Sequence, residues 1–350
     1  MKKIISLFVA LLLALSLLSG CEMTKTETSG KHETEDTSFP TDDTAADTAE
    51  PDTTEADSSD SDPDDADPSC PLFWKVTDGE GHTLYLFGTI HVGDERNEDV
   101  FNSLKGTLAE CDALAVEFDV VAYENDMAAM IRDIQTFLYT DGTRITDHCS
   151  AEMYEKMKQT LEDNGYYNSL YEMYDLALWS QLLDTAYVDN SSLSVDFGMD
   201  RLLIEEANRL GIQVLDVESS EFQTALSDSF SDELNILMIE ELLDMTYEEY
   251  YEELEQMYEA CLKGDADVIL GDEEEDTEGL TEEEIAMVED YNYKMVDERN
   301  VGMVEAAKEY LEGGQTVFFA VGCGHMVGEA GIVSLLEAEG YTVERVPLGK

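Results

Sequence analysis

Two histidines occupy the same place relative to an apolar run, and both could bind a metal ion or move a proton. His91 ends the motif GTIH after the run TLYLF (83–87), and His325 ends the motif GCGH after the run TVFFAV (316–321). A short β-rich apolar run that stops at glycine is typical of a strand followed by a turn. The chain has only 5 histidines, so two Gly-x-x-His motifs after strands favour a shared site over two separate hydrogen-bonded caps.

Two carboxylates end apolar runs in a comparable way. Glu117 closes DALAVE (112–117), and Glu218 closes IQVLDVE (212–218). In an open α/β sheet, ligands bind outside the carboxyl ends of the strands, so these side chains are expected at one edge. Imidazoles and carboxylates suit a divalent ion that keeps an open position for water. The sequence therefore predicts a metal site, and zinc, manganese and cobalt all agree with these donors. A helix-capping role remains the alternative for either glutamate.

Metal-assisted hydrolysis is the chemistry that such a set predicts. His91, His325 and one glutamate are expected to hold the ion, with Glu117 as the candidate ligand. The other glutamate is expected to accept the proton of the attacking water, so Glu117 and Glu218 are both candidate catalytic residues. Arg299 is the candidate for stabilising developing negative charge or for binding a substrate carboxylate, with a plain ion pair as the alternative.

The sequence indicates the α/β class, with a mixed central sheet of β-α-β units flanked by helices. An N-terminal β-hairpin is expected from strands at 72–77 and 83–87, and a turn is expected at Gly88. Helices are expected over 97–111, 297–311 and 330–339, and a last strand over 341–346. Ser150 is expected to cap the helix that leads to Gly165. Asp196 or Asp200 is expected to cap the helix that ends at Gly211. A helical insertion is expected over about 231–299, and its acidic segment 271–284 lacks the spacing of an EF-hand loop.

The charge balance excludes some classes of partner. With 81 acidic and 19 basic residues, the chain has a formal net charge of −62. Nucleic acid and anionic lipid surfaces would be repelled, so no nucleic-acid partner is expected. The cysteines show no Cys-x-x-Cys spacing, which argues against a disulfide framework or a zinc ribbon.

The N-terminus is typical of an exported lipoprotein. Lys2 and Lys3 precede an apolar run (4–18) and then Leu-Ser-Gly-Cys21, and the run is shorter than the roughly 20 residues that a membrane span needs. We predict a signal peptide over 1–20, a lipidated Cys21 followed by a disordered acidic tether over 21–69, and a folded domain over 70–350. The predicted location is the cell membrane, lipid-anchored through Cys21 and facing the extracellular side.

The motifs in their order resemble a known family. LYLFGTIHVGD, AVEFD, GMD, VLDVESSEFQ, DERNVGM and FFAVGCGHMVGEAG follow one another along the chain. This pattern resembles the TraB/PrgY/GumN (TraB/GumN) family, is related to that of the Tiki-type membrane-tethered metalloproteases, and is more distantly similar to the erythromycin esterase-like and ChaN-like folds. The resemblance covers about residues 71–347.

The resemblance implies a metal-dependent hydrolase of the metalloprotease kind, acting on a peptide or protein substrate. It implies His91 and His325 as the motif histidines, Glu117 as the motif glutamate, and Gly88, Gly322 and Gly324 as the motif glycines, and it favours manganese or cobalt. Arg299 and Asn300 match an Arg-Asn step of the family pattern, and Cys323 stands where alanine is usual.

Two alternatives from other classes stay open. A non-catalytic surface protein that captures a peptide, such as a pheromone, would use the same cleft without metal-dependent turnover. A haem- or metal-capturing lipoprotein of the ChaN-like kind ranks last, because the chain shows no axial-ligand motif.

Overall fold

The structure is a computed structural model that describes residues 71–271 and 279–348. The predicted signal peptide, Cys21, the tether and part of the acidic segment 271–284 lie outside these residues. Within them, no helix combines the length and the apolarity needed to cross a membrane.

A six-stranded mixed sheet forms the centre of the domain, as predicted. Its order is β4-β3-β5-β2-β1-β6, and β4, β3, β5 and β2 are mutually parallel, whereas β1 runs antiparallel to β2 and β6. The carboxyl ends of the four parallel strands therefore meet at one edge. The strands are β1 Phe73–Thr77, β2 Thr83–Thr89, β3 Ala113–Val116, β4 Gln213–Asp216, β5 Val317–Gly322 and β6 Thr342–Arg345.

Burial follows strand position in the sheet. All residues of β3 and β5 are buried, as expected for central parallel strands with helices on both faces. In the edge strand β4, two residues are exposed and two are half-buried. Phe73 of β1 stacks on Phe318 of β5 with ring centroids 5.8 Å apart, so aromatic contacts join the hairpin to the centre of the sheet.

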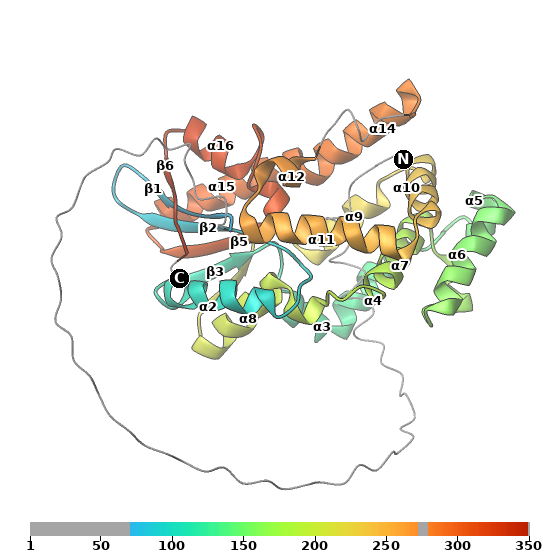
Figure 1. Cartoon of the computed structure of the whole chain (residues 1–350), viewed down its shortest axis with the longest axis horizontal. Helices are drawn as coiled ribbons and strands as arrows, with labels where there is room; N and C mark the ends of the chain where they lie inside the picture. Colours follow the sequence, from blue (N-terminus) through green and yellow to red (C-terminus); the bar gives the residue numbers. More distant parts are fainter. Residues whose placement is uncertain (1–70, 272–278, 349–350) are drawn as a thin grey trace, which may run out of the picture. The chain divides into compact units, whose positions relative to one another are not determined.

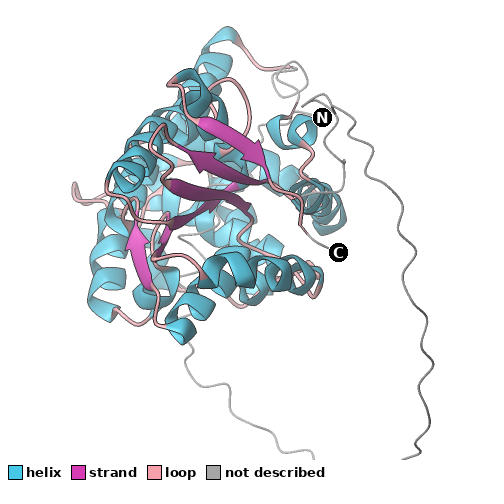
Figure 2. Cartoon of the chain, turned by 90° about the vertical axis from the view of Figure 1, so that its left-hand side faces the viewer, coloured by secondary structure: helices cyan, strands magenta, loops and turns pink. Residues whose placement is uncertain are grey.

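Helices cover both faces of the sheet (Figure 1). The helix α2 (Arg96–Ala109) packs on α8 (Met199–Leu210), and α8 contacts β3 and β4. Helix α15 (Glu298–Glu312) contacts β2 and β5 and packs on α16 (Ile332–Ala338), which lies against β6. Figure 2 shows helices packed around the strands of the sheet.

The remaining helices lie mainly between β3 and β5 in the sequence, where helical segments were predicted. Helix α7, which carries the fully buried Trp179, packs between α6, α10 and α11. A π-helical turn, η3, runs directly into α15. The segments are α3 Val120–Glu124, α4 Met127–Thr136, α5 Ile145–His148, α6 Ala151–Asp163, η1 Ser169–Met173, α7 Leu176–Val188, η2 Val195–Phe197, α9 Ser220–Asp228, α10 Asp232–Asp244, α11 Tyr247–Lys263, α12 Ala266–Leu270, α14 Glu282–Asn292, η3 Tyr293–Asp297 and η4 Cys323–His325.

One predicted helix cap is confirmed and another is wrong. Ser150 accepts a hydrogen bond from Met153 N at the start of α6. Helix α8 ends at Gly211 with φ +75°, as predicted, but its N-cap is Gly198, without a side-chain cap. The Asp200 carboxylate is not available to the helix, because it binds residues at the end of β2.

The turn predicted at Gly88 is also wrong. Strand β2 continues through Gly88 to Thr89, and Gly88 N donates to Leu72 O at 2.8 Å. A Cβ at this position would lie 3.0 Å from Leu72 Cβ and 3.1 Å from Cys323 Cα. Glycine is therefore needed for the close approach of neighbouring backbone, not for a turn.

Candidate metal and catalytic site

The structure brings the four predicted strand-end residues together at the carboxyl edge of the sheet. His91 follows β2, Glu117 follows β3, Glu218 follows β4 and His325 follows β5. His91, Glu117 and His325 are 8%, 5% and 4% exposed. Arg299, from the first turn of α15, is 4% exposed and joins the same cluster.

Three of these side chains surround one point above Gly322. A Cβ placed on Gly322 would lie 3.2 Å from Glu117 Oε1, 3.6 Å from His325 Cδ2 and 3.7 Å from His91 Nε2. His325 Nε2 lies 3.9 Å from Glu117 Oε1. The absence of a side chain at Gly322 thus leaves room at the centre of the cluster. A Cβ added to Gly324, the next motif glycine, would have no neighbouring atom within 4 Å, so Gly324 borders open space.

The carboxylate of Asp200 fixes the orientation of the His91 ring. Its Nδ1 lies 2.6 Å from Asp200 Oδ2, and the other carboxylate oxygen of Asp200 accepts a 2.6 Å hydrogen bond from Thr89 Oγ1. Met199 N donates to Ile90 O, which holds the start of α8 against the end of β2. Because Nδ1 is bonded to the Asp200 carboxylate, Nε2 is the ring nitrogen that could bind an ion at the centre of the site.

His325 is fixed by an amide instead of a carboxylate. Its Nδ1 lies 2.7 Å from Asn300 Oδ1, and Asn300 Nδ2 donates to Ala330 O at 2.9 Å. Asn300 is fully buried on α15. Both histidines are therefore anchored at Nδ1. His325 Nε2 lies 3.9 Å from Glu117 Oε1, and His91 Nε2 lies near the point above Gly322. Metal-binding histidines in proteins are commonly held in this way.

Glu117 is held at both oxygens. Oε1 accepts a hydrogen bond from Gly322 N at 2.9 Å. Oε2 accepts from Gln223 Nε2 at 2.9 Å and from Arg299 Nη2 at 2.6 Å. Of the two oxygens, Oε1 is the one that lies near both imidazoles.

Arg299 connects the two glutamates. Its Nε and Nη2 donate to the two oxygens of Glu218 at 2.9 and 2.8 Å, and Nη1 donates to Met295 O at 3.0 Å. Gln223 Nε2 also donates to Glu218 Oε2 at 2.9 Å. Each nitrogen of the guanidinium group is therefore already bonded to the protein. The acceptor Met295 O belongs to η3, so the π-helical turn supplies part of this arrangement.

These contacts shift the protonation equilibria in different directions. Burial lowers the pKa of His91, but the charge and hydrogen bond of Asp200 outweigh it and raise the pKa above its ordinary value. Burial, and then the charge of Arg299, lower the pKa of His325 to about 3. Burial would raise the pKa of Glu117, but Arg299 and the two histidines hold it well below its ordinary value. His325 is thus neutral and Glu117 ionised over the physiological range.

The donor set fits a divalent ion in its chemistry, although the groups are not gathered at coordination distances. Among residues 71–271 and 279–348, no three His, Cys, Asp or Glu side chains are arranged so as to hold a metal. Two imidazole rings and one carboxylate oxygen nevertheless face one point. The 3.9 Å between His325 Nε2 and Glu117 Oε1 is less than twice the roughly 2.1 Å length of a metal–ligand bond. His91, His325 and Glu117 are therefore the residues that could hold the ion.

Sequence reasoning misses four side chains that position this cluster. No local pattern distinguishes Thr89 or Gln223, and Asp200 has the pattern of a helix cap. Asn300 enters only through the family resemblance. The Gly-Met-Asp step at the start of α8 was an available signal for Asp200, because it places a carboxylate where a helix begins beside the sheet.

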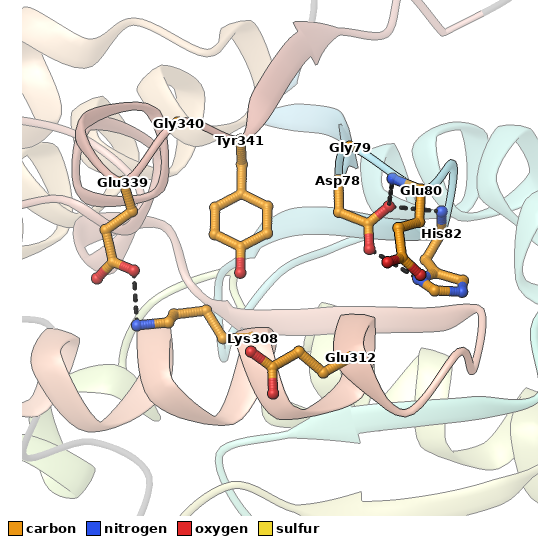
Figure 3. A pocket seen from close by; sticks show the side chains of 9 residues that line it. All are labelled: Asp78, Gly79, Glu80, His82, Lys308, Glu312, Glu339, Gly340 and Tyr341. Atoms are coloured by element: carbon orange, nitrogen blue, oxygen red, sulfur yellow. Dashed lines mark hydrogen bonds and ion pairs between the residues drawn. The ribbon is translucent and has the colours of Figure 1, made fainter.

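A separate pocket of about 540 Å³ lies at the other end of β2, beside the β1–β2 turn (Figure 3). His82 Nδ1 is paired with Asp78 Oδ2 at 2.7 Å. Lys308 Nζ is paired with Glu305 at 2.8 Å and Glu339 at 2.6 Å. These cationic groups already have carboxylate partners, and the strand-end histidines are not part of this pocket.

Comparison with known proteins agrees with the predicted resemblance. The model of the TraB/PrgY/gumN family matches residues 72–345. No curated protein and no solved structure matches the chain. The family match spans all six strands and both Gly-x-x-His motifs. The chain therefore belongs to the TraB/PrgY/gumN family.

Proposed function

We propose that this protein is a metal-dependent hydrolase that acts on a peptide or protein substrate. The observation that carries the proposal is the convergence of His91 Nε2, Glu117 Oε1 and the His325 ring on one point above Gly322, with both imidazoles anchored at Nδ1. Anchored histidines and a carboxylate of low pKa favour a divalent ion at this point.

The charges of the cluster support the same proposal. Glu117, Glu218 and Asp200 supply three carboxylates, and Arg299 supplies one compensating cation. With both histidines neutral the cluster carries a net charge of −2, and with His91 protonated it still carries −1. Buried net charge is costly unless it is paired or binds a metal, so a divalent cation would complete the balance.

The chain's own residues then divide into ligands and supports. His91, His325 and Glu117 would hold the ion, which would supply Lewis-acid activation of a water molecule and of the scissile carbonyl. The resemblance to the Tiki-type metalloproteases favours manganese or cobalt, and zinc is also compatible with the donors. The low pKa of Glu117 makes it a weak base, which favours a ligand role over proton transfer for this residue.

The contacts of Glu218 and Arg299 favour supporting roles. Both oxygens of Glu218 accept hydrogen bonds from Arg299, and one also accepts from Gln223. These hydrogen bonds use three of the roughly four acceptor sites of the carboxylate, which leaves Glu218 little room to act as a general base. Arg299 in turn uses four of its five N–H groups on the protein, so a single Nη1–H is left for a substrate carboxylate or an oxyanion. We therefore assign both residues to orienting Glu117.

We further propose that the domain is held at the cell membrane by lipidated Cys21 and faces the extracellular side. The support is the sequence Leu-Ser-Gly-Cys21 after a basic and apolar leader. Metabolic labelling with a fatty-acid probe should label the wild type, and the Cys21→Ala variant should lose the label.

The metal content of the purified protein tests the hydrolase proposal. We expect about one divalent ion per chain after loading with manganese or cobalt, and loss of that ion in His91→Ala and in His325→Ala. Hydrolysis of a quenched peptide library should require the ion and should disappear in both variants. His82→Ala is the matched control, because His82 lies in the β1–β2 turn away from this cluster.

The outcomes separate the proposal from its alternative. Ion binding that survives both substitutions would contradict the assigned ligands. A wild type that binds peptides but neither binds an ion nor turns them over would support the non-catalytic peptide-capture protein.

A further inference from the structure

We infer that Asn300 is a positioning residue that fixes the tautomer of His325, so that Nε2 presents a lone pair to the centre of the site. The inference deepens the proposed function and rests on it, because only an unprotonated ring nitrogen can bind an ion. The hydrogen bonds that join Ala330, Asn300 and His325 carry it.

The direction of the Asn300 amide is set by Ala330. A backbone carbonyl oxygen can only accept a hydrogen bond, so the group 2.9 Å from Ala330 O must be the NH2 of Asn300. The other amide atom, Oδ1, then faces His325 Nδ1 at 2.7 Å. If the amide were flipped, Asn300 Oδ1 would face Ala330 O, which places two acceptors against each other. The NH2 group would then face the His325 ring.

The direction of the amide determines the tautomer of the ring. Oδ1 can only accept, so His325 Nδ1 must carry a hydrogen. A neutral imidazole has a single N–H, which leaves Nε2 with a lone pair. The 3.9 Å gap between Nε2 and Glu117 Oε1 agrees with this assignment, because it exceeds a hydrogen-bond distance. Two acceptors therefore face each other across the gap.

The position of Asn300 explains how this arrangement is kept. It is fully buried on α15, one residue after Arg299, whose side chain holds Glu117. Ala330 lies between η4, which contains His325, and α16. The segment that follows the second Gly-x-x-His motif thus orients that motif's own histidine through a side chain of α15.

Imidazole ¹⁵N NMR of the full-length, metal-free protein tests the tautomer directly. We expect His325 in the wild type to show a protonated Nδ1 and an unprotonated Nε2. The Asn300→Asp variant keeps an acceptor for Nδ1 and should keep this tautomer. The Asn300→Leu variant removes the acceptor at similar side-chain size and should shift the ring toward the Nε2–H form. Asn235→Leu is the matched control, because Asn235 is a buried asparagine on α10 that donates to Ser231 O.

Manganese affinity gives the second readout. Loss of a residue that orients a metal ligand typically costs 10–100-fold in affinity, so we expect a loss of about that size in Asn300→Leu, with Asn300→Asp closer to the wild type. Asn235→Leu should lower stability without moving either the His325 signals or the affinity.

The possible results distinguish the two proposals. An Nε2–H tautomer in wild-type His325 would overturn the inference, whether or not the protein is found to bind manganese. An unchanged tautomer in folded Asn300→Leu would overturn it as well. An Nδ1–H tautomer that depends on Asn300, in a wild type that binds no ion, would support the positioning role and overturn the metal-dependent function.

Discussion

At the scale of single residues, Arg299 controls how the two buried glutamates are arranged. It donates to Glu117 and Glu218 with its side chain 1% exposed. Removing one member of a buried ion pair leaves an uncompensated charge, which costs more than the pair itself contributes. The stability of the site therefore depends on this residue more than on any surface ion pair.

Substituting Arg299 tests this dependence. We expect Arg299→Met to lower the free energy of unfolding by about 3–5 kcal/mol at pH 7, because Glu117 and Glu218 lose their cation. Urea denaturation measures the change. Lys308→Met is the control, since Lys308 pairs with Glu305 and Glu339 nearer the surface and its loss should lower the free energy of unfolding much less. Equal losses in the two variants would contradict the assigned role.

A second residue-scale prediction concerns Asp184 on α7. Burial raises its pKa to about 7. Burial also raises the pKa values of Tyr187 and Tyr250, and the charge of Asp184 adds to both shifts. The unfolded carboxyl ionises near pH 3.8, so the unfolded state loses its proton first, and this group costs stability as the pH rises from about 4 to about 7.

Asparagine at this position would remove the ionisation. We expect Asp184→Asn to be more stable than the wild type at pH 8, by on the order of 4 kcal/mol, and the difference to shrink toward pH 4. Unfolding curves at several pH values measure it. A stability difference that stays constant with pH would contradict the assignment to Asp184.

At the scale of elements, the ends of β2 and β5 require glycine for different reasons. Gly88 lies within β2 and allows it to pass close to Leu72 and Cys323. Gly322 ends β5, donates its N–H to Glu117 Oε1 and leaves the central space of the site open. Gly324 has no neighbouring atom within 4 Å of an added Cβ.

The two glycines of the second motif therefore form a matched pair. We expect Gly322→Ala to displace Glu117 Oε1, to reduce manganese affinity at least 10-fold and to cost about 1–3 kcal/mol of stability. Gly324→Ala should keep the affinity and change stability by no more than about 0.5 kcal/mol. Isothermal titration and urea denaturation measure both effects. Similar affinities in the two variants would argue against the central space above Gly322.

At the scale of the whole molecule, the acidic composition sets the response to salt. The chain has a net charge of −62, so its acidic side chains repel one another in the compact state, and added salt screens that repulsion. We expect the melting temperature to rise as NaCl increases from about 0.05 to about 0.5 M, a range over which the Debye length shortens markedly. Differential scanning calorimetry measures the change. A melting temperature that falls over this range would show that salt weakens ion pairs more than it relieves repulsion.

The sequence by itself determined the main features of this protein. Apolar runs and glycines predicted the parallel strands and the hairpin, and they placed His91, Glu117, Glu218 and His325 at one edge of the sheet. These signals are readable because strand and turn preferences act over a few neighbouring residues.

Only the tertiary structure decided which partners hold these side chains. Asp200 meets His91 across 109 residues, Arg299 meets Glu117 across 182, and Asn300 connects His325 to Ala330. Asp200 has the residue type and the position of a helix cap. It bonds to His91 instead because α8 packs against the end of β2. Local sequence does not determine such choices, since the direction of a side chain and its hydrogen-bond partner depend on which distant segments pack beside it.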